Sequence, residues 1–134
     1  MDSAIRPVKM RKTNRRGRMG MVSQLKIDKD CHVARSWICD YVERIRSTCR
    51  SHGLRVLSIQ MSRTKKGQHY YVDIRPTIPP EKANRLQWLL GDDCLRVDYN
   101  RARIQSGLDD WNKLFETIGQ RYETLYGKVP AGTR

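Results

Sequence analysis

The chain has 134 residues, of which 27 are Lys or Arg and 14 are Asp or Glu, so its formal net charge is +13. This length suits one domain, and no apolar run approaches the ~20 residues of a membrane-spanning helix, so no membrane partner is expected. The basic excess favours DNA or RNA as the partner, in the cytoplasm.

The basic residues are concentrated at the N-terminus, where residues 1–26 hold eight Lys or Arg and one Asp. Residues 1–22 have few apolar anchors and are predicted to be a disordered basic arm, followed by a single domain over residues 23–134. The arm is expected to contact phosphates through Arg11, Lys12, Arg15, Arg16 and Arg18. A solubilising or targeting tail is the alternative.

Patterned sequence begins near Gln24. Leu25 and Ile27 alternate with polar residues and predict a short strand. Residues 33–51 carry apolar side chains at helical spacing and precede Gly53, which predicts a helix and its end. Residues 54–61 and 68–75 predict two strands of a hairpin around a polar turn over residues 62–67.

Pro79 and Pro80 predict the start of a second helix, which ends at Gly91. Residues 94–98 predict a strand, and after Ser106 and Gly107 a last helix is predicted to run to about Tyr126. Trp88, Trp111 and Phe115 lie on apolar helical stripes and are expected in the core. The order predicts a ferredoxin-like (RRM-like) α+β fold: a βαββαβ four-stranded antiparallel sheet with two helices on one face and an extra C-terminal helix.

The opposite face of this sheet is predicted to be open and polar. Alternation directs Lys26, Asp28, Asp30, His69, Tyr71, Asp73, Arg96 and Asp98 onto it. Carboxylates that converge at strand ends offer the hard oxygen ligands that Mg²⁺ and Mn²⁺ prefer. The four cysteines show no C-x-x-C spacing, so free thiols and no zinc are expected.

Three segments resemble motifs of the archaeo-eukaryotic primase-like (primase-polymerase) superfamily, over roughly residues 25–98. Asp28-Lys-Asp30 is similar to its D-x-D motif, and the Ser62–His69 segment is similar to its second motif, a serine and glycine-rich turn that leads to histidine. Leu95-Arg-Val-Asp98 is similar to its third motif, an aspartate that ends an apolar strand. The resemblance concerns the RRM-like catalytic half of that family.

The resemblance implies metal-dependent nucleotidyl transfer from nucleoside triphosphates. Asp28, Asp30 and Asp98 would be the catalytic carboxylates and would ligate Mg²⁺ or Mn²⁺, and Ser62, Lys66 and His69 would bind the nucleotide phosphates. Arg96, Arg101 and Arg103 are not fixed by the motifs and are given a general role in phosphate contact.

Other interpretations stay open at this point. Asp28 and Asp30 suit the cap of the following helix, and Asp98 suits a surface ion pair with Arg101 or Arg103. The main rival function is a non-catalytic RRM-like module for RNA or DNA, in which Tyr71, with His69 beside it, stacks on a base. An accessory protein of a mobile element is a third class.

Overall fold

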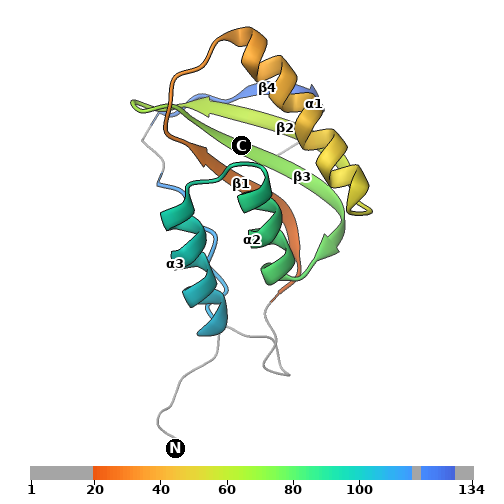
Figure 1. Cartoon of the computed structure of the whole chain (residues 1–134), viewed down its shortest axis with the longest axis vertical. Helices are drawn as coiled ribbons and strands as arrows, with labels where there is room; N and C mark the ends of the chain where they lie inside the picture. Colours follow the sequence, from red (N-terminus) through yellow and green to blue (C-terminus); the bar gives the residue numbers. More distant parts are fainter. Residues whose placement is uncertain (1–19, 116–118, 129–134) are drawn as a thin grey trace, which may run out of the picture.

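The computed structural model describes residues 20–115 and 119–128 (Figure 1). Seven elements follow one another along the chain: β1 (Val22–Lys29), α1 (Arg35–Ser51), β2 (Arg55–Arg63), β3 (Gln68–Ile78), α2 (Pro80–Leu89), α3 (Cys94–Gln105) and β4 (Glu123–Gly127). The predicted first strand, first helix, hairpin and second helix are confirmed, with ends that differ by a few residues.

The four strands form one antiparallel sheet in the order β1-β3-β2-β4. Strand β3 pairs with both β1 and β2, which therefore run parallel to each other with α1 between them in sequence, the split βαβ arrangement. Strand β4 pairs with the outer edge of β2. The α+β class and the antiparallel sheet are confirmed, the element order is βαββααβ, and β1 is an edge strand among the described residues.

Two predicted elements after Gly91 are wrong. The predicted strand at residues 94–98 is the first part of α3, because Asp93 caps a helix there by accepting a hydrogen bond from Leu95 N at 3.0 Å. The predicted C-terminal helix is not present among the described residues between 107 and 126. Its last part is β4, which forms because the outer edge of β2 offers it backbone hydrogen bonds.

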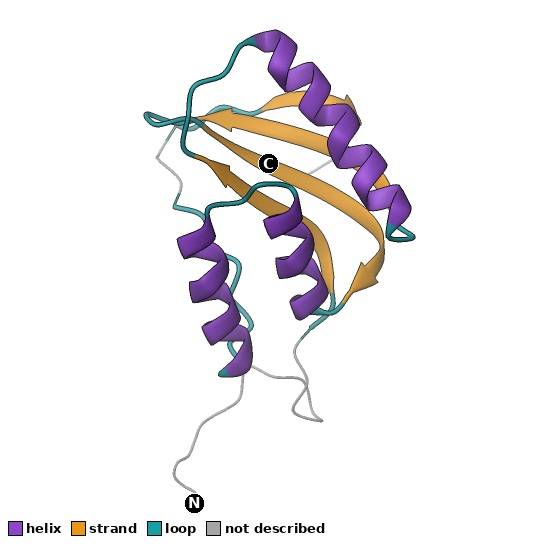
Figure 2. Ribbon diagram, in the orientation of Figure 1, coloured by secondary structure: helices purple, strands orange, loops and turns teal. Residues whose placement is uncertain are grey.

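Helices α1 and α2 lie over the same face of the sheet, and α3 lies beside α2 (Figures 1 and 2). The apolar stripe of α1 supplies Ile38, Tyr41, Ile45 and Cys49 to the core, where they meet the inward-facing side chains of β1, β2 and β3. The Tyr41 hydroxyl donates a 2.5 Å hydrogen bond to Leu90 O at the end of α2, so the two helices are tied together across the core.

The large aromatic side chains divide between core and surface. Trp111 is 3% exposed, as predicted. Trp88 is 55% exposed and Phe115 is 93% exposed, so their prediction as core residues is wrong. Phe115 lies outside any helix, and Trp88 lies near the end of α2.

The polar side chains of β1 and β3 lie on the sheet face that the sequence predicted for them. In register across the sheet, Asp28 lies opposite His69 and Lys26 opposite Tyr71. This face is not open at its centre, because Tyr71 is 2% exposed and packs edge-to-face on Tyr122 at 5.6 Å between ring centroids. The segment that leads into β4 therefore covers part of it.

The predicted basic arm over residues 1–22 falls almost entirely outside the described residues, together with its five candidate phosphate contacts. Val22 belongs to β1. No helix in the described part of the chain has the length and apolar character needed to cross a membrane.

Candidate metal-binding site

The edge of β1 is covered by side chains from α2, α3 and the turn between them. Lys26 N donates to Gln87 Oε1, and Asp28 N donates to Asp92 Oδ1, both at 2.9 Å. Arg96 Nη1 donates to Lys26 O at 3.0 Å. An edge strand exposes unpaired backbone groups, and here polar side chains satisfy them.

Asp92 and Arg96 form a buried ion pair within this cover. Arg96 Nη1 lies 2.5 Å from Asp92 Oδ2, and their side chains are 10% and 0% exposed. Burial raises the pKa of Asp92, while the Arg96 guanidinium and the N–H groups of Asp28 and Asp93 lower it. Arg96 also donates to Asn112 Oδ1 at 2.6 Å, which ties the chain after α3 to the same point.

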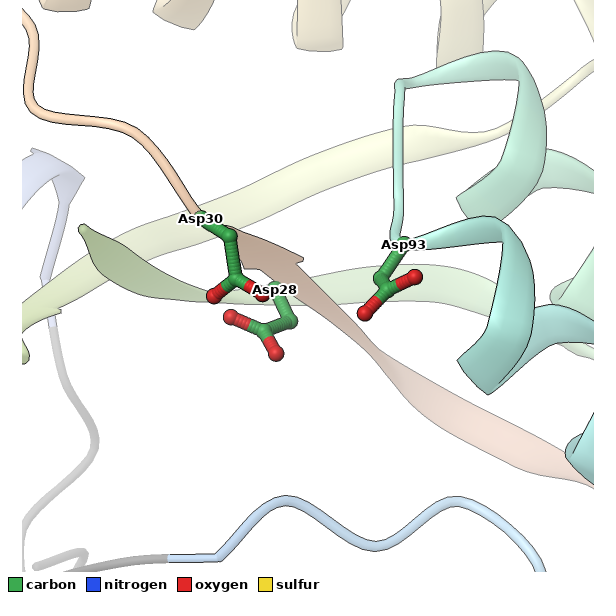
Figure 3. Close-up of side chains that lie close together, drawn as sticks. All are labelled: Asp28, Asp30 and Asp93. Carbon is green, nitrogen blue, oxygen red and sulfur yellow. The ribbon is translucent and has the colours of Figure 1, made fainter. Parts of the chain in front are cut away.

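Three carboxylates gather beside this network. Asp28 lies near the end of β1, Asp30 follows the strand, and Asp93 is the N-cap of α3. One carboxylate oxygen from each lies within 4.8 Å of the others. The close-up shows the Asp28 and Asp30 side chains approaching each other, with Asp93 facing them across the end of the strand (Figure 3). We call Asp28, Asp30 and Asp93 the acidic cluster.

Within the acidic cluster, the pKa of Asp28 is raised. Burial, followed by the charges of Asp30, Asp92 and Asp93, raises the pKa of Asp28 from 3.8 to about 6, against the opposing effect of Arg96. Asp28 Oδ1 is buried and accepts no hydrogen bond from the described residues, although His69 Nε2 lies 3.5 Å away. Burial and the neighbouring carboxylates therefore disfavour the ionised form of Asp28.

The hairpin turn between β2 and β3 supports the segment that carries Asp30. Gln68 Nε2 donates to Cys31 O at 2.5 Å, and Thr64 and Gly67 close the turn through Thr64 N to Gly67 O at 2.9 Å. Gly67 approaches so closely that a Cβ there would lie 1.9 Å from Lys29 O. The glycine of the turn is thus required by contact with the backbone at the end of β1 and just after it.

Gly67→Ala is therefore expected to lower the free energy of unfolding by about 2 kcal/mol, because backbone atoms must move to admit the methyl group. Urea unfolding measures the effect as a shift in midpoint at constant slope. Gly20→Ala is the matched control, since a Cβ there has no neighbour within 4 Å among the described residues. Equal stability of the two variants would contradict the close approach.

The structure brings some of the residues selected from sequence together and separates others. Asp28 and Asp30 converge, and neither caps α1, whose N-cap Ala34 has no side-chain capping bond. Asp98 lies on α3, exposed, and pairs with Arg101 at 3.0 Å, as the ion-pair alternative anticipated. The apolar strand on which it was matched to a third motif is a helix.

The remaining candidates lie in different surroundings. Ser62 is 1% exposed and faces His69 across the hairpin, and His69 is 7% exposed, so neither presents an open phosphate-binding surface. Lys66 is exposed at the hairpin turn. Tyr71 is covered, so stacking of a base on its ring is prevented. Arg96 holds Asp92, whereas Arg101 and Arg103 are exposed on α3.

Asp93 is the member of the acidic cluster that sequence reasoning missed. Asp92 and Asp93 follow Gly91 in the turn between α2 and α3, outside every motif selected from the sequence. Aspartate before an apolar stripe is also a helix N-cap signal, and that signal would have placed Asp93 at a helix start beside the sheet.

The donor set of the cluster fits a divalent cation of the Mg²⁺ or Mn²⁺ type. All three groups are carboxylates, and one oxygen of Asp28 retains unused lone pairs. No zinc-type set of Cys and His accompanies them in the described residues.

Comparison of the chain with protein-family models, with curated proteins and with solved structures finds no match.

Proposed function

We propose that the chain is a nucleic-acid-binding protein in which the acidic cluster holds Mg²⁺ or Mn²⁺ for nucleotidyl transfer, on a scaffold like a minimal primase-polymerase core. The observation that carries the proposal is the convergence of Asp28, Asp30 and Asp93 in a chain of net charge +13. Acidic groups are the minority charge here, so their gathering at one point is the feature that calls for a cation.

Different residues of the chain would hold the cation and contact the phosphates. Asp28 lies in β1, Asp93 caps the start of α3, and Gln68 of the hairpin holds the backbone of Cys31, next to Asp30, so the backbone that carries the three carboxylates would be in place before a cation arrives. A bound cation would neutralise phosphate charge and activate a hydroxyl group. Exposed basic side chains such as Lys66 and Arg101 would contact phosphates from outside the cluster.

The proposal is tested first by metal binding to the full chain. Titration with Mn²⁺, followed by loss of the free-ion electron paramagnetic resonance signal, should show binding that Asp93→Asn weakens by at least about 10-fold. Asparagine retains the helix cap, so this variant removes charge with little loss of structure. Asp98→Asn is the matched control on the same helix and should bind Mn²⁺ like the wild type.

Incorporation of labelled nucleotides on single-stranded and primed templates then tests catalysis, with Asp28→Asn as the inactive variant. Equal binding of Mn²⁺ by wild type and Asp93→Asn would overturn the metal site. Mn²⁺ binding with equal incorporation by wild type and Asp28→Asn would remove the cluster from catalysis and leave a non-catalytic module for DNA or RNA as the function.

A further inference from the structure

An open groove of about 770 Å³ runs along α2 and α3 and reaches His52 at the end of α1. Its buried lining residues are Asn84 on α2 and Val97 and Ile104 on α3, which are 5%, 4% and 7% exposed. The acidic cluster contributes no residue to it. The groove is therefore a surface separate from the candidate metal site.

Trp88 is the largest side chain in the lining. It is 55% exposed, although the sequence places it on an apolar stripe of α2. A half-exposed indole beside a concave surface retains a flat apolar area that a ligand would cover. The aliphatic part of the lining consists of two buried branched side chains, Val97 and Ile104.

The charged lining residues are mostly basic. Lys82, Arg85 and Arg101 line the groove against a single acidic residue, Glu81. Arg101 has Asp98 as its partner, but that pair is exposed, with side chains 61% and 66% accessible, and such pairs are weak. The charge therefore complements an anionic ligand.

We propose that this groove binds single-stranded nucleic acid, with one base stacked on Trp88 and the adjoining phosphates contacted by Arg85 and Arg101. A basic channel with an exposed aromatic ring is the combination that binds single strands without sequence preference. The Asn84 amide is already engaged, since its Nδ2 donates to Val97 O at 3.0 Å, so it does not read a base edge. The proposal rests on the proposed nucleic-acid-binding function and specifies where the strand lies.

The test measures binding of fluorescent oligo(dT) of about 12 nucleotides to the full chain by anisotropy, in EDTA and at about 200 mM salt, where long-range attraction to basic segments is reduced. Trp88→Ala should weaken binding by about 5- to 100-fold, and Trp88→Phe should recover most of the loss. Tyr99→Ala is the matched control, because Tyr99 is 61% exposed on α3 and does not line the groove.

Two variants that each remove one positive charge complete the test. Arg101→Gln should lower affinity and reduce the salt dependence, whereas Arg103→Gln, on the same helix outside the groove, should have the smaller effect. Photocrosslinking of an oligonucleotide that contains 5-bromouracil should label the peptide with Trp88. If Trp88→Ala binds oligo(dT) as tightly as the wild type, the proposed binding of the strand in this groove is wrong, and the proposed function is not affected. If the wild type does not bind oligo(dT), both the groove proposal and the proposed nucleic-acid-binding function are wrong.

Discussion

Arg96→Met is expected to lower the free energy of unfolding by about 3–5 kcal/mol at neutral pH, because it leaves the fully buried Asp92 carboxylate without its cation. Methionine retains the bulk of the side chain but no donor. The substitution also removes the hydrogen bonds from Arg96 to Lys26 O and to Asn112 Oδ1, so the edge of β1 and the chain after α3 lose the same support.

Urea unfolding of the metal-free protein measures this effect. Arg101→Met is the matched control, since it breaks an exposed ion pair one turn further along α3 and should change stability by less than about 1 kcal/mol. The double variant Asp92→Asn with Arg96→Met should recover part of the loss, because it no longer buries an unpaired charge. If Arg96→Met and Arg101→Met are equally stable, the buried pair does not hold the edge of β1.

Part of the fold could be predicted from sequence, and part could not. The first helix and the hairpin were predictable because their signals are local: apolar side chains at helical spacing, a glycine stop at Gly53, and two branched runs around a polar turn. The segment at Leu95–Asp98 has one buried apolar residue, Val97, and that single residue fits a strand or a helix equally well. The capping aspartate before it decides the outcome.

The C-terminal segment was mispredicted for a different reason. Its apolar residues follow a helical stripe, yet Phe115 is 93% exposed and Gly119 adopts a positive φ of 82°, which favours a turn. Residues 123–127 pair with β2, whose partner residues lie 62 to 69 positions earlier in the chain. A backbone partner so distant in sequence leaves no local signal, and pairing with an open sheet edge outweighs helix periodicity.

The change from a predicted strand to a helix after Gly91 also decides which members of the acidic cluster could be predicted. Asp28 and Asp30 belong to the first strand and its end, which sequence identified correctly, so their convergence was predictable. The third carboxylate depended on the element after Gly91. With a helix there, the N-cap Asp93 faces the end of β1, and Asp98 pairs with Arg101.

The raised pKa of Asp28 leads to the second large effect, a stability that falls as pH rises. Its pKa of about 6 in the folded chain exceeds the ordinary 3.8, so between these values the folded state binds more protons than the unfolded state. The free energy of unfolding should therefore decrease from pH 4 to pH 6 by up to about 3 kcal/mol through this group, and level off above that range.

Asp28→Asn should remove this dependence, since a neutral amide of the same shape has no charge to bury. In EDTA the variant should match the wild type near pH 4 and exceed its stability by up to about 3 kcal/mol at pH 7.5. Asp98→Asn should follow the wild type across the range, because Asp98 is exposed. A variant destabilised by the same amount at every pH would show that Asp28 contributes through its contacts rather than through its charge. Excess Mn²⁺ should stabilise the wild type at pH 7.5 and not Asp28→Asn, because the cation binds the ionised Asp28 carboxylate and the amide offers no such charge.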